Sequence, residues 1–281
     1  KLPQIPVGEC AFHVIAQEKI VDGVCSDDFT IDKIKEFLIK NTDAQPDKLD
    51  KLDKSDKEEV IEVAKETLGC SSESCIIERD EFKDFIGFSN FQKARQRFKE
   101  HGPANSNKWL NNSNIDNTIN QWRKMFPSFL HVPFQMSDFD TEGTELNDID
   151  LATEFNGKYE SMGVVLNTDI SSGNGIHWFC IFADARNKKH ITIEVFDSAG
   201  NIPPGSVIRW VAKQRLALAK AFPESKVEDI VVTRQNKLQY SNSECGVFSL
   251  WYIFCRLNQV PHSYFTKPGS VTDDMMLQFR K

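Results

Sequence analysis

The feature that most constrains the fold is a nearly unbroken apolar run at residues 245–257, which reads Cys-Gly-Val-Phe-Ser-Leu-Trp-Tyr-Ile-Phe-Cys-Arg-Leu. Because the run is apolar on nearly every side, it predicts a helix buried in the middle of a domain. Ser243 is a suitable N-cap, which would place Cys245 in the first helical turn. There the helix dipole and the unpaired N–H groups favour a thiolate, the reactive form of cysteine. Gly246 would let backbone approach closely behind the sulfur.

Taken alone, Cys245 is better explained as a buried structural cysteine, the role that we expect for Cys255 on the same helix. The residues upstream reverse this preference. His177, Asp197 and Gln239 would supply a base, an orienting carboxylate and an amide donor for an oxyanion. With the cysteine nucleophile, this is the set of groups that a cysteine protease needs.

The histidine and the aspartate flank a predicted hairpin. Residues 163–168, 178–183 and 191–196 are rich in β-branched and aromatic residues and predict three strands, with a polar loop at 169–175 and a turn at 186–189. The midpoint between His177 and Asp197 falls inside this turn, so the two residues should face each other across the strands, with Cβ atoms roughly 4.5–5.5 Å apart. A bulge would shift the register by one residue. A lone histidine at the start of a strand would be a surface residue, but the matching Asp197 favours a functional role.

Gln239 and Trp178 have weaker support. The side-chain amide of Gln239 could donate to an oxyanion together with the backbone N–H of Cys245. Only its spacing from Cys245 favours it over the nearby Gln235. Trp178 would form a wall of the site beside the histidine, or else be an aromatic residue of the core.

Composition limits the other classes of function. The chain has 281 residues, 40% of them hydrophobic, which suits one large domain or a core with a smaller appendage. Its net charge of −7 argues against a dominant nucleic-acid surface, so we expect no nucleic-acid partner. No apolar run approaches the length of a membrane span, and the polar start does not resemble a signal peptide.

The seven cysteines predict free thiols, because an odd number in a protein without a secretion signal indicates a reducing compartment. Cys70 and Cys75 could form half of a metal site. No second pair has compatible spacing, so we expect no metal and no cofactor.

The chain divides by composition into a helical arm and a catalytic core. Residues 1–101 are rich in lysine and glutamate, with an amphipathic helix at 27–40, a charged linker at 48–57, and a helix at 60–68 between a capping box at Ser55 and a stop at Gly69. A phenylalanine stripe follows and predicts a packing face of the arm; it comprises Phe82, Phe85, Phe88, Phe91 and Phe98. Gly102-Pro103 marks the boundary.

Residues 102–281 predict an α+β core, with helices at 115–126, 207–222 and 245–257, the three strands, a polar stretch at 137–150 and a further strand at 227–233. None of the candidate site residues falls within the arm. We therefore expect the arm to contribute to substrate engagement and not to the chemistry.

Several motifs resemble those of a known family. The order of His-Trp, Phe-Asp-Ser and Gln-x5-Cys-Gly resembles the clan of adenovirus-type and ubiquitin-like-protein-processing cysteine proteases. Residues 68–77, 114–122, 165–169 and 200–210 more closely resemble the polyprotein-processing proteases of large DNA viruses, of the African swine fever virus type. The African swine fever virus member carries asparagine in place of Asp197, whereas the wider clan has aspartate.

This resemblance implies a papain-like or adenain-like core, a central sheet flanked by helices, preceded by a helical arm domain. It implies Cys245 as nucleophile, His177 as general base, Asp197 as orienting acid and Gln239 in the oxyanion hole. It also implies cleavage after Gly-Gly in viral structural polyproteins and capsid precursors during virion maturation, in the virion and the host-cell cytoplasm. Two alternatives stay open: an isopeptidase that removes SUMO or ubiquitin, and an inactive protease fold with a structural role.

Overall fold

The computed structural model describes residues 2–3, 8–18, 23–42, 56–100, 102, 108–141, 143–234 and 236–280. These fall into two compact units, an arm unit within Pro6–Glu100 and a core unit within His101–Lys281 together with Lys1–Ile5. Gln235, Ser55, Pro103 and residues 48–55 of the predicted linker lie outside the described residues.

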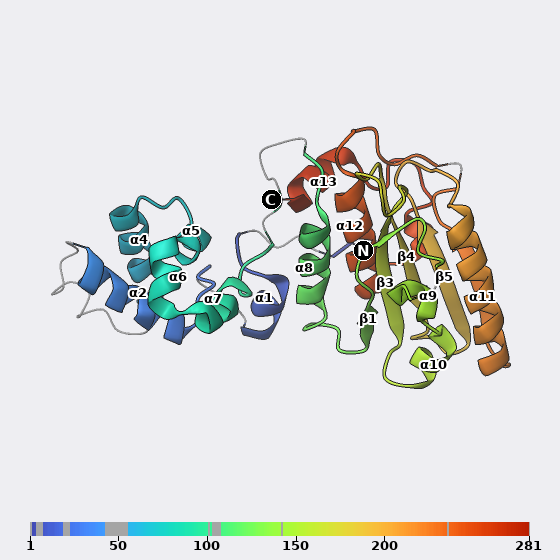
Figure 1. Cartoon of the computed structure of the whole chain (residues 1–281), viewed down its shortest axis with the longest axis horizontal. Helices are drawn as coiled ribbons and strands as arrows, with labels where there is room; N and C mark the ends of the chain where they lie inside the picture. The colour runs from blue at the N-terminus through green and yellow to red at the C-terminus, as the bar shows by residue number, and fades with distance from the viewer. Residues whose placement is uncertain are drawn as a thin grey trace. The chain divides into compact units, whose positions relative to one another are not determined.

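The arm unit is helical, as the sequence predicts. Its helices are α1 (Phe12–Glu18), α2 (Asp28–Asn41), α4 (Lys57–Leu68), α5 (Glu73–Glu78), α6 (Asp80–Ile86) and α7 (Phe88–Arg95) (Figure 1). The predictions for α2 and for the C-terminal end of α4 are confirmed, but α4 begins at Lys57 after Asp56, which makes no side-chain capping hydrogen bond, so the predicted helix start with a capping box at Ser55 is wrong. Asp27 caps α2 by accepting a hydrogen bond from the Thr30 N–H, and Gly69 ends α4 in the left-handed conformation with φ of 66°.

The phenylalanine stripe does not form one continuous face. Gly87, with φ of 77°, interrupts the helical stretch between α6 and α7. Phe82 and Phe98 are fully buried in the arm's own hydrophobic core, whereas Phe88 is 76% exposed. The stripe therefore stabilises the arm internally, and the prediction that it forms an external packing face is wrong for its two most buried members.

The prediction of free thiols is wrong for four of the seven cysteines. Cys10 is bonded to Cys25 and Cys70 to Cys75, both within the arm unit. Cys25 follows Cys10 by 15 residues, and this spacing alone does not show that the two cysteines are bonded. The second bond also removes Cys70 and Cys75 as candidate metal ligands, because their sulfurs are joined to each other.

The core unit is built on a six-stranded mixed sheet. Its strands are β1 (Phe129–His131), β2 (Gln135–Met136), β3 (Ser161–Asn167), β4 (Trp178–Asp184), β5 (His190–Phe196) and β6 (Lys226–Val231). The order across the sheet is β1-β3-β4-β5-β6, with β2 also paired to β3. Strands β3, β4 and β5 form an antiparallel meander, which confirms the predicted hairpin, and β6 adds in parallel to β5. The sequence did not predict β1 and β2, which have only three and two residues.

Helices cover both faces of this sheet (Figure 1). They are α8 (Asn112–Trp122), α9 (Glu145–Asp148), α10 (Leu151–Asn156), α11 (Gly205–Ala221), α12 (Cys245–Leu257) and α13 (Asp273–Arg280), with a 3-10 turn, η1, at His262–Tyr264. The predicted apolar helix is α12, with the bounds that the sequence indicates, and it packs on β3 and β4 together with α8 and α13. On the opposite face, α9, α10 and α11 share one hydrophobic core with the sheet. The α+β prediction, a sheet flanked by helices, is confirmed.

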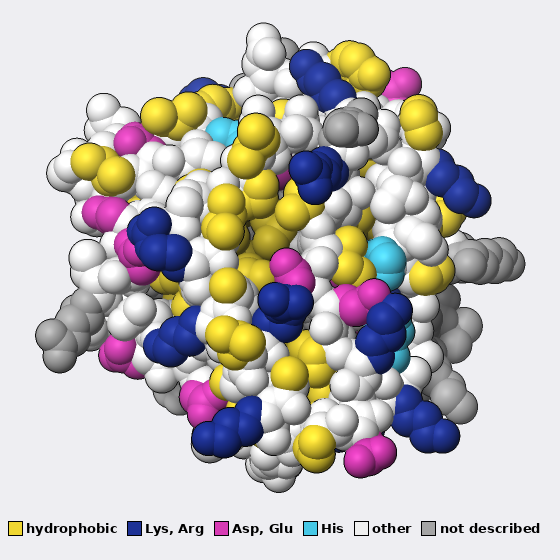
Figure 2. All heavy atoms as spheres, turned by 90° about the vertical axis from the view of Figure 1, so that its right-hand side faces the viewer, with side chains coloured by type: hydrophobic (Ala, Val, Ile, Leu, Met, Phe, Trp, Pro, Cys, Tyr) yellow, Lys and Arg dark blue, Asp and Glu magenta, His cyan; other side chains and the backbone are white. Residues whose placement is uncertain are grey.

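Two surface properties bear on the partners. Within the described ranges, no helix is both long enough and apolar enough to cross a membrane. Figure 2 shows the side of the molecule on which α11 lies, where lysines and arginines are interspersed with acidic and apolar side chains. That face therefore presents no continuous basic surface.

Candidate active site

The β4–β5 hairpin brings His177 and Asp197 together. His177 directly precedes β4, Asp197 directly follows β5, and His177 Nε2 lies 2.8 Å from Asp197 Oδ1. The predicted proximity is confirmed, but the predicted register is wrong. Cys180 pairs with Phe196, so the strand register is offset by two residues from one that would place His177 opposite Asp197. The two side chains can still meet because both residues lie just outside the strands, where the backbone is no longer held by the hydrogen bonds between β4 and β5.

The Asp197 carboxylate is buried and held from several sides. Oδ1 accepts hydrogen bonds from His177 and from the Ala199 N–H at 2.8 Å, and Oδ2 accepts one from Asn201 Nδ2 at 3.1 Å. The Asp197 N–H donates to the Thr233 hydroxyl. These contacts fix the position of the carboxylate relative to His177. Asn201 was not identified from the sequence, although its position shortly after the acid, in the Gly200-Asn201 motif, could have indicated it.

The imidazole of His177 is held in its charged form. Burial disfavours the imidazolium, but hydrogen bonds and charge interactions with Asp197 and Cys245 outweigh it and raise the pKa of His177 to about 9. Because Nε2 is engaged with Asp197, Nδ1 is the nitrogen left to interact with the Cys245 thiol. At neutral pH the site can therefore hold an imidazolium beside the sulfur, the arrangement that activates a cysteine.

Cys245 is the first residue of α12, and its N-cap is Glu244. The prediction that Ser243 caps the helix is wrong, because the Ser243 hydroxyl donates to the Glu244 carboxylate instead of accepting from the first turn. Cys245 is nevertheless in the first turn, as expected. The first N–H groups of a helix have no intrahelical acceptor, so the Cys245 N–H remains available to an incoming oxyanion.

A buried ion pair braces the residue before the nucleophile. Both Glu244 carboxylate oxygens accept from Arg280 of α13, at 2.9 Å each, and Arg280 also donates to the Lys108 carbonyl. The two charged side chains are 1% and 2% exposed, so each depends on the other for its charge to be tolerated. Sequence reasoning missed this pair. A glutamate directly before an apolar run signals that a partner is needed, but not which one.

Gln239 is fixed next to the catalytic hairpin. Its side-chain oxygen accepts from the Ser198 hydroxyl at 2.7 Å, and its backbone N–H donates to the Ser198 carbonyl at 2.9 Å. The side-chain NH₂ donates to the Ser241 carbonyl, which leaves its second hydrogen for another acceptor. These contacts fix the amide orientation, with the nitrogen as the donor that an oxyanion hole requires.

Trp178 lies against the first turn of α12. Its indole N–H donates to the Leu110 carbonyl, and a Cβ on Gly246 would approach the ring to 3.2 Å. The missing side chain at Gly246 therefore makes room for the Trp178 ring, and not for a backbone segment as the sequence suggested. The ring is only 4% exposed, which favours the core alternative that the sequence left open. The neighbouring Trp109, 42% exposed and hydrogen-bonded to the Asn242 carbonyl, was not identified from sequence.

The other free thiols lack this environment. Burial raises the pKa of both Cys180 and Cys255, which keeps them as unreactive thiols. Among the residues that the structure describes, no group of three or more His, Cys, Asp or Glu side chains is arranged to hold a metal ion.

Comparisons with known proteins agree with this arrangement. A profile of the Ulp1 protease family, C-terminal catalytic domain, matches residues 164–281. The chain is 38% identical over 232 residues to a cysteine protease of African swine fever virus, covering 77% of this chain and 83% of the relative. It is 24% identical to a putative thiol protease of Acanthamoeba polyphaga mimivirus, covering 68% and 62%. The crystal structure of the African swine fever virus protease is similar with a TM-score of 0.75 and 31% identity, covering 99% of this chain and 95% of the other.

Proposed function

Because this chain belongs to the family of the African swine fever virus cysteine protease, we propose that it is an endopeptidase that processes viral structural polyproteins after Gly-Gly. One observation carries the proposal: the thiol at the start of a buried helix shares a hydrogen bond with a histidine that a buried carboxylate keeps protonated. The Gly-Gly preference, and action in the virion and the host-cell cytoplasm, come from the family resemblance.

In the first step, the Cys245 thiolate attacks the scissile carbonyl. Asp197 fixes the imidazole through Nε2, so Nδ1–H of His177 points toward the sulfur and the departing amine. His177 gives this proton to the amine as the peptide bond breaks, which leaves an acyl-enzyme on Cys245. The neutral imidazole then takes a proton from water, which attacks the thioester and releases the product acid.

The oxyanion formed in each step needs fixed donors. The Cys245 N–H and the Gln239 amide are the two donors at this site. Ser198 and Ser241 hold the amide and leave its second N–H hydrogen to donate. In comparable enzymes the removal of one such donor costs about 3–4 kcal/mol of transition-state stabilisation. Neither donor must reorganise during the reaction, because backbone and side-chain contacts hold both in place.

A second candidate function is the removal of SUMO. Several African swine fever virus relatives of similar identity bear the name SUMO-1 cysteine protease, and the matching family profile is that of the Ulp1 proteases. The chemistry would be the same, since both reactions break an amide bond after a glycine pair. The substrate distinguishes them.

A side-by-side comparison of substrates tests the proposal. The protein is incubated in parallel with a Gly-Gly-Xaa peptide from a capsid precursor, the intact precursor, a SUMO conjugate and a ubiquitin conjugate. We expect cleavage of the precursor at Gly-Gly, mapped by mass spectrometry, and no cleavage by a Cys245→Ala variant. Strong turnover of SUMO conjugates with no cleavage of the precursor would overturn the proposal in favour of the second function.

A further inference from the structure

At the end far from Cys245, buried charged side chains anchor the nucleophile helix to the sheet. All of α12 is buried, and Arg256 in its last turn is its only charged residue. Side chains that pack through apolar contacts alone tolerate small shifts along a helix axis, whereas a single buried polar group can fix a register. Arg256 is therefore the residue of α12 best suited to fix the position of this helix on the sheet.

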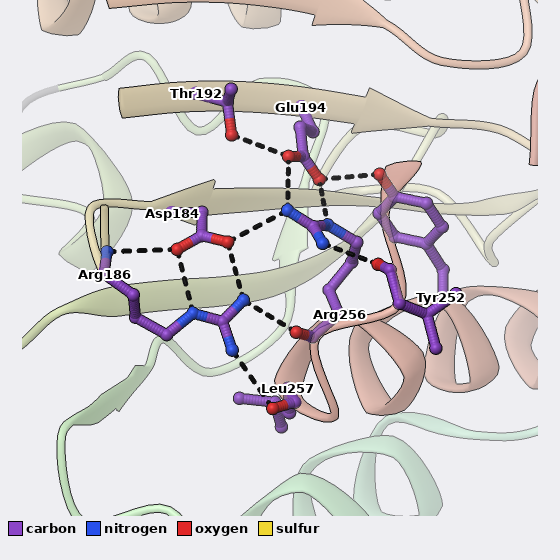
Figure 3. Close-up of polar contacts among 8 residues, drawn as sticks. Asp184, Arg186, Thr192, Glu194, Tyr252, Arg256 and Leu257 are labelled. Carbon is purple, nitrogen blue, oxygen red and sulfur yellow. Dashed lines mark hydrogen bonds and ion pairs between the residues drawn. The ribbon is translucent and has the colours of Figure 1, made fainter. Parts of the chain in front are cut away.

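The guanidinium of Arg256 has an acceptor for each of its nitrogens. It binds both oxygens of Glu194, with Nε to Oε2 at 2.7 Å and Nη2 to Oε1 at 2.9 Å. Nη2 also lies 2.9 Å from Asp184 Oδ2, and Nη1 donates to the Val260 carbonyl at 2.6 Å. Figure 3 shows the planar fork inserted between the two carboxylates. Such bidentate geometry constrains position and orientation together.

The carboxylates are themselves fully engaged. Glu194 is completely buried and also accepts from the Tyr252 hydroxyl at 2.7 Å and the Thr192 hydroxyl at 2.6 Å. Asp184 accepts a second fork from Arg186, which in turn donates to the carbonyls of the last residues of α12 (Figure 3). A network with every member satisfied holds one geometry, because any displacement leaves a buried charge unpaired.

The three elements in this network are those that carry the candidate triad. Glu194 lies on β5, three residues before Asp197; Asp184 ends β4, which begins after His177; and Arg256 shares α12 with Cys245. A helix rises about 1.5 Å per residue, so the eleven steps along the chain from Cys245 to Arg256 span roughly 16 Å. Over that length α12 transmits a shift at one end to the other as a nearly rigid element.

We propose that Arg256 is a positioning residue for catalysis: its ion pairs with Glu194 and Asp184 set where α12 sits on β4 and β5, and hence where Cys245 meets His177. The inference rests on the proposed function, since it concerns the same nucleophile. Buried ion pairs contribute little stability relative to apolar residues of similar volume. Stability and positioning can therefore be separated by experiment.

The test replaces the network by apolar isosteres in the full chain, with Thr192→Val, Glu194→Met, Tyr252→Phe and Arg256→Met combined. Asp184 keeps its fork from Arg186. We expect a folded protein of unchanged or higher melting temperature whose kcat is lowered at least about 10-fold with KM within about two-fold, the signature of a lost transition-state interaction. The acid limb of Cys245 alkylation should move to higher pH, because a displaced thiol loses the support of the imidazolium.

Two further variants keep the proposal open to refutation. Arg256→Lys retains the charge but not the fork, and should lower kcat and shift the alkylation profile in the same direction. Arg215→Met is the matched control, since it removes an exposed ion pair with Asp229 on α11 and β6, and should change neither. Wild-type kcat and an unchanged alkylation profile in the folded fourfold variant, or in Arg256→Lys if the former does not fold, would show that the network is purely structural. Loss of peptide turnover in the wild type itself would instead indicate failure of the proposed function.

Discussion

At its first residue α12 presents a thiol to a histidine that is still 16% exposed, whereas in its last turn it presents a guanidinium to a carboxylate that solvent does not reach. At the first end, the Cys245 N–H and one Gln239 hydrogen are left for a ligand. At the second, each nitrogen of Arg256 already has an acceptor. Both ends contain buried charge, but only the first leaves capacity for a reaction.

This difference shows how perturbed groups can be assigned a role. Hydrogen bonds and opposite charges shift the protonation of groups at both ends, so a shifted pKa alone does not identify an active site. The distinguishing property is an incomplete set of partners. A network in which every polar group has a partner holds one geometry, whereas a site that must bind a transition state has hydrogen-bond donors without a partner until the substrate arrives. Five predictions test this comparison.

The largest effect should come from the nucleophile. Cys245→Ala is expected to lower peptide turnover at least about 10⁴-fold, because no other group can form the acyl-enzyme. The melting temperature should change little, since the first turn tolerates a small side chain. The matched control is Cys255→Ala on the same helix, which should retain activity and lose about 1 kcal/mol of stability from a buried cavity. Retained turnover in pure Cys245→Ala protein would remove the nucleophile assignment.

The second effect concerns the ion pair next to the nucleophile. Arg280→Met would leave the Glu244 carboxylate buried without a countercharge, which is expected to cost about 3–5 kcal/mol in urea unfolding. Turnover should fall with it, because Glu244 directly precedes Cys245. Adding Glu244→Gln to Arg280→Met should recover part of the stability. An unchanged unfolding midpoint for Arg280→Met would mean that this pair does not brace the turn.

These two effects mark what the sequence could and could not predict. The apolar run fixed the bounds of α12, and the β-branched segments fixed β4 and β5, because local patterns determine where such elements form. The two-residue offset of the hairpin, the Cys10–Cys25 bond and the Glu244–Arg280 pair were not predictable in this way. Each depends on a partner that is not adjacent in the sequence or on the geometry of a turn, and the pattern of apolar and polar residues specifies neither.

The third prediction concerns the charge of the orienting residue. Asp197→Asn keeps an oxygen for His177 but removes the negative charge, so the pKa of His177 should fall from about 9. We expect turnover at neutral pH to fall about 10-fold, the worth of one charge-assisted hydrogen bond, and not the ~10⁴-fold seen for the serine-protease aspartate. The alkaline limb of kcat/KM should move to lower pH, and an unmoved limb would show that Asp197 does not set the imidazole charge.

The same shift predicts how stability depends on pH. A raised histidine pKa stabilises the folded state fully below the ordinary value of 6.5, and this stabilisation is lost as pH rises through about 9. In wild-type protein the free energy of unfolding should therefore decline between these values, and in Asp197→Asn the decline should end at lower pH. Parallel curves for the two proteins would contradict the assignment.

The smallest effect should come from Asn201, which donates to the carboxylate oxygen that His177 does not use. Asn201→Ala removes one of three donors to Asp197, while His177 and the Ala199 N–H remain. Because the asparagine is exposed, water can replace its amide, and the loss should be about 1 kcal/mol, or roughly five-fold in turnover. Asn201→Asp is the informative companion, since a second carboxylate beside Asp197 should raise the pKa of His177 further while weakening the orientation of Asp197 by repulsion. If Asn201→Ala lost as much activity as Asp197→Asn, the carboxylate would depend on this one donor. The Cys245 end of α12 would then, like the Arg256 end, fail when a single hydrogen bond is removed.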